Sequence, residues 1–181
     1  MFHANTQRLI DYWLARKGAA PAPARAAIDP AALPALLPQL FMLGRARPGH
    51  YVFRLAGGLV DELHGGRLAG SDALGLWTVA HRPPLQLALE ASLRAPEPLV
   101  ITAEGRAAHR QPLALEITFA PLAGADGDIN RLLGLYQPIT PVAALLGQAL
   151  EALAMRSIAT ARFPNGSPRL RLAAVDGRQI A

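Results

Sequence analysis

The sequence contains four side chains that could contact a ligand: Arg54, His64, Trp77 and His81. Arg54 comes near the end of a predicted strand, just before a double glycine. Its guanidinium could anchor an anion, because it presents a rigid fork of hydrogen-bond donors. The structural alternative is an ion pair that ties the helices to the sheet, with Asp61, Glu62 or Glu116 as the acidic partner. Such paired charges are the commoner case in proteins.

Trp77 and the two histidines also have both a functional and a structural interpretation. Trp77 could stack on a planar ligand, although a single tryptophan in an apolar stretch is usually part of the core. His64 and His81 could serve as axial ligands of haem, because imidazole binds iron and an apolar pocket suits a porphyrin. His64, however, stands at a predicted helix end, where it can cap free carbonyls, and His81 directly precedes Arg82-Pro83-Pro84. We therefore do not expect haem, and any cofactor is unidentified.

The remaining motifs argue against several classes of enzyme and metal site. The five histidines are far apart and form no HxxxH or HExxH pattern, and the chain has no cysteine. The sequence has no P-loop, GxGxxG or GxSxG motif. Asp61 and Glu62 are neighbours on a short predicted helix and point in different directions, so they do not form a facing acid–base pair. We expect neither a catalytic activity nor a metal site.

The composition is typical of one compact domain with extensions. The chain has 181 residues, of which 51% are apolar and 17% are charged, so it can bury one core. Proline, glycine or charge interrupts every apolar run, and none approaches the roughly 20 apolar residues that a membrane helix needs. The N-terminus has neither the basic nor the apolar region of a signal peptide. Because cysteine is absent, the sequence predicts a protein of the reducing cytoplasm.

The formal net charge of +5 is concentrated at the C-terminus. Residues up to Glu151 include 13 basic and 12 acidic side chains, whereas the tail from Arg156 has five arginines and one aspartate. A nearly neutral body with a short basic tail differs from a domain with a basic binding face. The tail also lacks interleaved aromatic residues, so we do not expect nucleic-acid binding. It could contact an acidic partner or a membrane surface, or simply aid solubility.

The first 27 residues are predicted to form a helix followed by an Ala/Pro-rich linker. Leu9, Ile10, Trp13 and Leu14 make an apolar stripe at helical spacing. This stripe must pack either on its own domain or on a second copy of the chain. Because it lies outside the predicted sheet, we expect a homodimer that forms through Leu9, Tyr12 and Trp13.

The middle of the chain predicts two strands, a set of short helices and three longer strands. The strands are expected at residues 39–43, 51–56, 99–104, 112–122 and 132–137, and the helical segments at 59–64 and 77–95. Phe53 alternates with Arg54 along the second strand, so Arg54 is expected on the opposite face of the sheet from Phe53. Turn residues at hairpin spacing connect the last three strands, which favours antiparallel pairing.

The C-terminal part, residues 141–181, is predicted to begin with an Ala/Leu-rich helix over residues 141–155. Two short runs then flank Asn165-Gly166, a dipeptide that suits a tight hairpin turn. The tail could therefore be a hairpin, and a disordered basic tail is an equal alternative.

Three stretches carry a family resemblance. They are the helix Leu9-Ile10-Asp11-Tyr12-Trp13, the segment from Ile28-Asp29-Pro30 to Pro38, and the strand-to-turn Phe53-Arg54-Leu55-Ala56-Gly57. With these motifs the chain resembles, over roughly residues 6–140, a PAS-type family of unknown function found mainly as single-domain proteins of alphaproteobacteria. One position departs from the family pattern: a small polar residue usually follows the glycine, whereas this chain has Gly58.

The resemblance implies an α+β fold with a five-stranded antiparallel sheet, helices on one face and an enclosed pocket. Residues 28–140 would form this PAS-like domain, with a helical N-terminal extension. The resemblance also implies a regulatory role in signalling, often in cell-cycle or motility control, without a uniform ligand. We expect a sensory module that binds a small molecule or a partner protein. The alternative is an adaptor that binds no small molecule and works only through its surface.

Overall fold

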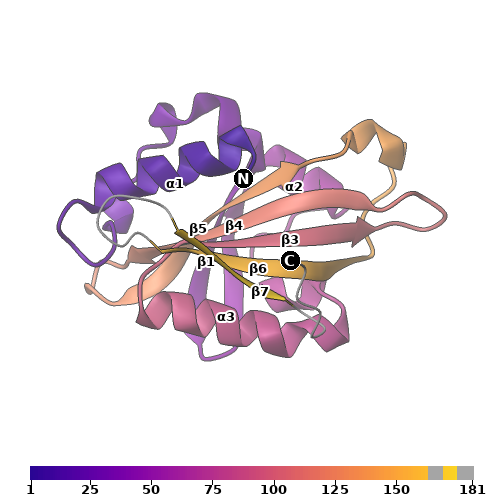
Figure 1. The fold of residues 1–181 in the computed structure, drawn as a ribbon. Coiled ribbons are helices and arrows are strands. Elements are labelled where there is room, and N and C mark those ends of the chain that lie inside the picture. The colour runs from indigo at the N-terminus through magenta and orange to yellow at the C-terminus, as the bar shows by residue number, and fades with distance from the viewer. Residues whose placement is uncertain (163–168, 175–181) are drawn as a thin grey trace.

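The computed structural model describes residues 1–162 and 169–174, and it contains one antiparallel sheet of seven strands (Figure 1). The order across the sheet is β2-β1-β5-β4-β3-β6-β7. The strands are β1 (Leu40–Arg47), β2 (His50–Ala56), β3 (Leu99–Arg106), β4 (Leu113–Ala123), β5 (Ile129–Pro138), β6 (Ala152–Arg162) and β7 (Arg169–Ala174). The five strands expected from the sequence are β1 to β5, and all are confirmed as antiparallel. Two further strands extend the sheet beyond β3.

Helices cover both faces of this sheet. They are α1 (Ala4–Lys17), α2 (Gly58–Leu63) and α3 (Arg82–Arg94), with the short 3-10 helices η1 (Arg25–Ala27), η2 (Pro30–Ala32), η3 (Pro34–Gln39), η4 (Ala73–Leu76), η5 (Val79–His81) and η6 (Val142–Leu145). Figure 1 shows α1 on one side of the sheet and α3 on the other. We call the face toward α2 and α3 the inner face and the face toward α1 the outer face. Within the described residues, no helix has the length and apolar character needed to cross a membrane.

The alternation of side chains along β4 shows how one strand serves both layers. Leu115 and Ile117 pack in the cluster of the inner face, whereas Ala120 and Leu122 pack in the cluster that includes α1 on the outer face. Successive side chains of a strand point to opposite faces, so a strand buried on both sides needs apolar residues at nearly every position. The sheet therefore separates two hydrophobic cores, one on each of its faces.

Helix α3 begins at its prolines. Pro83 and Pro84 occupy the first turn, where a missing N–H costs nothing and the fixed φ suits the helix. The helical segment expected over residues 77–95 is an α-helix only from Arg82 onward: the prolines lie in its first turn, and the residues before them form η5 and a connecting segment. Leu85 and Leu89 are fully buried against the inner face.

Glu90 fixes α3 to the β1–β2 hairpin through four hydrogen bonds. Its carboxylate accepts two from the Arg45 guanidinium, at 3.0 and 2.7 Å, one from the Tyr51 hydroxyl at 2.6 Å and one from the Gly49 amide at 3.3 Å. Burial raises the pKa of Glu90, but the hydrogen bonds from Tyr51 and Arg45 outweigh it, so the pKa lies below its ordinary value. The bidentate geometry makes this the best-formed ion pair in the described part of the chain.

We predict that Glu90→Gln lowers the free energy of unfolding by about 1–3 kcal/mol, because the charged acceptor of this network is lost. The depressed pKa of Glu90 also gives the network a pH dependence of known sign: its contribution is present above the unfolded-state pKa and is lost as the pH falls through the folded-state pKa. Urea denaturation of both chains at pH 7 and pH 3 measures this. The difference between them should shrink at the lower pH, and an undiminished difference would contradict the assignment.

Helix α1 packs on its own sheet. Leu9 is fully buried, Trp13 is 1% exposed, and both belong to the cluster of the outer face. The Trp13 indole N–H donates a hydrogen bond of 2.6 Å to the carbonyl of Pro121 in β4. Tyr12 is half-buried, and its hydroxyl accepts from the Asp29 amide at 2.8 Å. The stripe therefore packs on its own domain, the first of the two alternatives, and Leu9 and Trp13 have no surface left for a second copy. Homodimerisation stays a prediction, without these residues as its basis.

The expected helix over residues 141–155 is also wrong. Leu146 and Gly147 have φ of 49° and 77°, which ends the short helix η6, and Ala152–Arg162 forms the strand β6. β6 pairs with β3 along eight positions, so it satisfies backbone groups that would otherwise form an open edge. This long-range pairing overrides the helical preference of an Ala/Leu-rich segment.

The tail forms the hairpin that was one of its two alternatives. β6 and β7 pair antiparallel from Ser157 opposite Ala174 to Arg162 opposite Arg169. The Asn165-Gly166 turn predicted between them lies outside the described residues.

Candidate functional site

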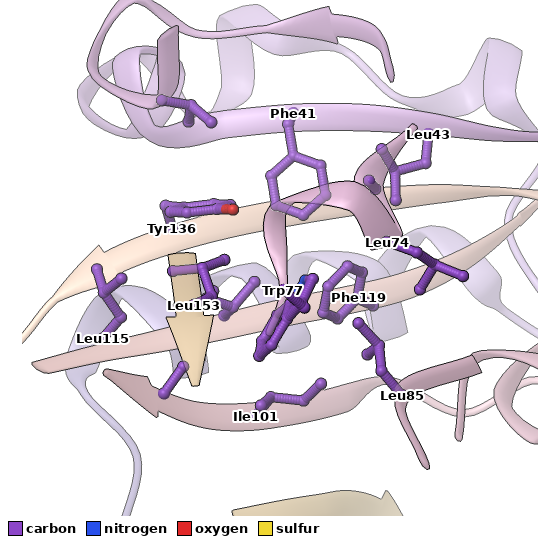
Figure 2. Close-up of a cluster of buried hydrophobic side chains, with 14 of the residues drawn as sticks. Phe41, Leu43, Leu74, Trp77, Leu85, Ile101, Leu115, Phe119, Tyr136 and Leu153 are labelled. Carbon is purple, nitrogen blue, oxygen red and sulfur yellow. The ribbon is translucent and has the colours of Figure 1, made fainter. Parts of the chain in front are cut away.

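The space between the inner face and helices α2 and α3 is filled by packed side chains (Figure 2). The labelled members of this cluster are Phe41, Leu43, Leu74, Trp77, Leu85, Ile101, Leu115, Phe119, Tyr136 and Leu153. Trp77 is only 2% exposed and lies among them. The Phe41 ring meets the rings of Phe119 and Tyr136 edge-on, each at 5.5 Å between centroids. The structure therefore places Trp77 in the core, as its structural interpretation predicted.

Two polar side chains face each other at the edge of this apolar interior, one buried and one half-buried. His64, at the end of α2, and Tyr136, in β5, are joined by a hydrogen bond of 3.2 Å between His64 Nε2 and the Tyr136 hydroxyl. Their rings are nearly perpendicular, with centroids 5.6 Å apart. Tyr136 is 2% exposed, so its hydroxyl is far from bulk water. We call these two residues the His64–Tyr136 pair.

Burial controls the protonation of both members of the pair. Burial lowers the pKa of His64 to about 4, against a smaller opposing effect of the nearby Asp61 carboxylate. Burial also raises the pKa of Tyr136 well above its ordinary value. Both side chains are therefore neutral at pH 7. One donates and the other accepts, and the imidazole tautomer decides which. The pair can present a neutral hydrogen-bond donor or acceptor to a molecule in the interior.

The lowered pKa of His64 predicts that acid destabilises the fold. The unfolded chain binds a proton at His64 near pH 6.5 and the folded chain only near pH 4, so stability is lost as the pH falls between these values. The expected loss from pH 7 to pH 5 is on the order of 2 kcal/mol. His64→Gln keeps a hydrogen-bonding group but cannot titrate. Urea denaturation should show a clearly smaller loss for this variant, and equal losses in the two chains would contradict the buried, neutral histidine.

His81 has a structural position at the edge of the same core. Its Nδ1 lies 2.7 Å from the Thr78 hydroxyl and accepts a hydrogen bond of 3.3 Å from the Met155 amide. Met155 stands next to a β-bulge, where Arg156 is the extra residue of β6 opposite β3. The bulge frees the Met155 amide from the ladder, and His81 satisfies it. His81 thus connects the start of α3 to β6.

Arg54 lies on the other side of the sheet from His64, Trp77 and His81. It is the extra residue of a β-bulge in β2, because Leu55 pairs with Met42 and Phe53 with Leu43. Phe53 belongs to the inner cluster, and Arg54 is exposed with the outer-face residue Met42 nearby, so its expected face is confirmed.

The expected ion pair of Arg54 with Asp61, Glu62 or Glu116 is not formed. Among the residues that the structure describes, the ion pairs are Arg45–Glu90, His50–Asp72 and Arg156–Glu104. The Glu116 carboxylate accepts from the His3 amide, and the Asp61 carboxylate accepts from the Leu68 amide. Asp61 and Glu116 thus hold backbone groups in place.

Sequence reasoning missed Tyr136 as a partner of His64. The alternation in β5 contained a signal, because Leu132 and Tyr136 both fall on the inner side and a tyrosine hydroxyl there must find a partner. The identity of the partner could not be found in this way, since His64 is 72 positions away in sequence.

The sequence profile of the PAS domain matches residues 1–137. This chain belongs to the PAS domain family. The match includes α1 and ends in β5, so the β6–β7 hairpin extends the sheet beyond the matched region. No match was found among curated proteins. PAS domains are in general sensory and signalling modules, and family membership assigns this chain to that general class.

Proposed function

We propose that this PAS module is a sensor that receives a small ligand in the interior between its sheet and helices α2 and α3, and that a partner protein reads the resulting change. The observation that carries the proposal is the His64–Tyr136 pair, in which a neutral hydroxyl inside an otherwise apolar cluster is bonded to a neutral, half-buried imidazole at its edge. Binding sites of small molecules are typically apolar, with a few polar groups that orient the ligand. The proposal assigns no catalytic step to the chain.

The pair also suggests how a ligand would change the protein. A ligand that replaces either His64 Nε2 or the Tyr136 hydroxyl as the hydrogen-bond partner of the other competes with the existing hydrogen bond, because these two groups are engaged with each other. His64 immediately follows the short helix α2, so a shift of its side chain is transmitted to that helix. Since packed side chains occupy the interior, the ligand must select a conformation in which α2 has moved outward. The ligand class that fits is a small, mainly apolar molecule with one polar group.

The packed interior favours a second candidate function. Trp77 and the aromatic rings around Phe41 fill the centre of the domain. A domain whose interior is occupied in this way can work as an adaptor that recognises a partner protein through its surface alone. This alternative needs no ligand and no movement of α2.

A thermal-shift screen with a panel of small metabolites separates the two functions. If the module is a sensor, at least one compound should raise the melting temperature of the wild-type chain by several degrees and that of Tyr136→Phe by much less, because that variant loses only the hydroxyl. Tyr12→Phe is the matched control on the surface of α1 and should respond like the wild type. If no compound shifts the wild type, the adaptor is the better description. A shift that is equal in wild type and Tyr136→Phe contradicts the role of the pair.

A further inference from the structure

A hollow on the outer face of the sheet is lined by three arginines. It has a volume of about 620 Å³ and lies where η1 and the β4–β5 loop approach β1, β2 and β5. Its lining includes Arg25, Met42, Arg54, Leu55, Gly124 and Arg131. We call it the arginine hollow. It is separated from the His64–Tyr136 pair by the sheet, so it is a different site from the one proposed above.

Two of the guanidinium groups converge over Gly44. A Cβ at this glycine would lie 2.7 Å from Arg54 Nε and 3.1 Å from Arg131 Nη1. The missing side chain therefore leaves the space in which the two cations meet. Two positive charges that approach the same point repel each other. An anion bound between them would be attracted by both.

Strand geometry places both arginines on the side of the hollow. Arg54 is the bulge residue of β2, whereas Arg131 is in regular register opposite Gly44 of β1 and shares the outer face with Leu133. Bulges are frequent next to functional sites because they redirect side chains. The third arginine, Arg25, is brought over the hollow by the segment before η1, where the Ala123 amide donates to the carbonyl of Pro23 at 2.9 Å.

The positive charge of the hollow is not neutralised by the described residues. None of its lining residues is acidic, and none of the three arginines takes part in an ion pair within the part of the chain that the structure describes. The Asp126 carboxylate lies beside Gly124 and accepts hydrogen bonds from the Asp128 amide and the Asn130 side chain. Arg131 donates only a long hydrogen bond, 3.4 Å, to the carbonyl of Asn130.

We propose that the arginine hollow binds a phosphate-bearing small molecule. Guanidinium groups recognise phosphate oxygens through paired hydrogen bonds, and two of them already point at one place. The remaining wall is apolar, with Met42 buried and Leu55 42% exposed, and can contact the organic part of such a molecule.

The size and charge of the surroundings favour a small molecule over a polyanion. The volume of about 620 Å³ is within the usual range for small-molecule sites. Up to Glu151 the chain has 13 basic and 12 acidic side chains, so this part of the chain has little net positive charge to attract a polyanion such as nucleic acid.

Isothermal titration of the full chain with inorganic pyrophosphate and with ADP tests the proposal. Both should bind, ADP more tightly because of the apolar wall. Arg54→Ala and Arg131→Ala should each weaken pyrophosphate binding by about tenfold or more, since each removes charged hydrogen bonds. Arg54→Lys, which keeps the charge but not the fork, should lose part of the affinity. Thermal melts confirm that each variant is folded.

Two controls separate this site from general attraction and from the interior. Arg94→Ala removes the same charge from the exposed end of α3, and Tyr136→Phe alters only the His64–Tyr136 pair; both should bind pyrophosphate like the wild type. If Arg54→Ala and Arg94→Ala lost the same affinity for pyrophosphate, the binding would depend only on the net charge of the chain, and the proposal would be overturned. Absence of binding to both probes would also overturn it, as would binding only to vesicles that contain a phosphoinositide.

Discussion

Replacing Gly57 by alanine is expected to lower the free energy of unfolding by at least about 3 kcal/mol, because the new methyl group has no room. A Cβ at this position would lie 2.3 Å from the carbonyl oxygen of Leu37 and 2.4 Å from that of Pro38. Both are backbone atoms, so no side-chain rotation relieves the contact. The Gly57 amide also donates a hydrogen bond of 2.7 Å to the carbonyl of Leu40, which holds the chain close to η3.

Gly58 provides the matched control one position away. A Cβ there would meet nothing within 4 Å, and Gly58 is the first residue of α2, where alanine is the better helix former. Gly58→Ala should therefore leave stability unchanged or raise it slightly. Urea denaturation of the two variants measures the contrast. A Gly57→Ala chain as stable as Gly58→Ala would show that η3 and the end of β2 do not pack as described.

The second large effect is expected for Trp77→Ala, with a loss of about 3–5 kcal/mol. Trp77 is 2% exposed in the inner cluster, so its removal deletes many contacts and leaves a cavity in the centre of the domain. Leu87→Ala in α3 is the control, because Leu87 is 71% exposed and its truncation should cost little. Urea denaturation at pH 7 again gives the difference. A loss below about 1 kcal/mol for Trp77→Ala would mean that Trp77 lines an open space rather than a packed core.

This result also bears on the function of the interior. A dry, apolar cavity of this kind can accept small apolar molecules. If Trp77→Ala gains affinity for such molecules and the wild type has none, the tryptophan is what closes the interior, as the adaptor requires. If the wild type already binds a ligand, Trp77 moves to admit it.

The strands and their faces could be predicted from the sequence because the signal is local. Alternation along β4 and β2 identified the antiparallel strands and placed Arg54 opposite Phe53. The family motifs added the order of the elements and the PAS fold, which the profile match confirms over residues 1–137.

The errors arose where a distant segment decides the structure. Residues 152–155 favour a helix by composition, but they form a strand because they pair with the edge of β3 that would otherwise be unpaired. The Leu9–Trp13 stripe shows that α1 packs on something, yet only the apolar outer face of the sheet explains why it packs on its own chain.

The candidate site was predicted only in part for the same reason. His64 and Trp77 were identified, and both lie on the inner side of the sheet, but only Trp77 belongs to the core cluster. The role of His64 depends on Tyr136, which the fold brings to it from β5. Two of the three acids expected to pair with Arg54, Asp61 and Glu116, instead accept hydrogen bonds from backbone amides, and local sequence does not show which donor an acid will have.

Native mass spectrometry of the freshly purified chain tests the central claim, that the interior of this PAS module receives a ligand. The sensor predicts a bound species at one molecule per chain, either co-purified or added from the thermal-shift screen, and its loss in Tyr136→Phe. A mass that corresponds to the bare chain under all these conditions would contradict ligand sensing in the interior.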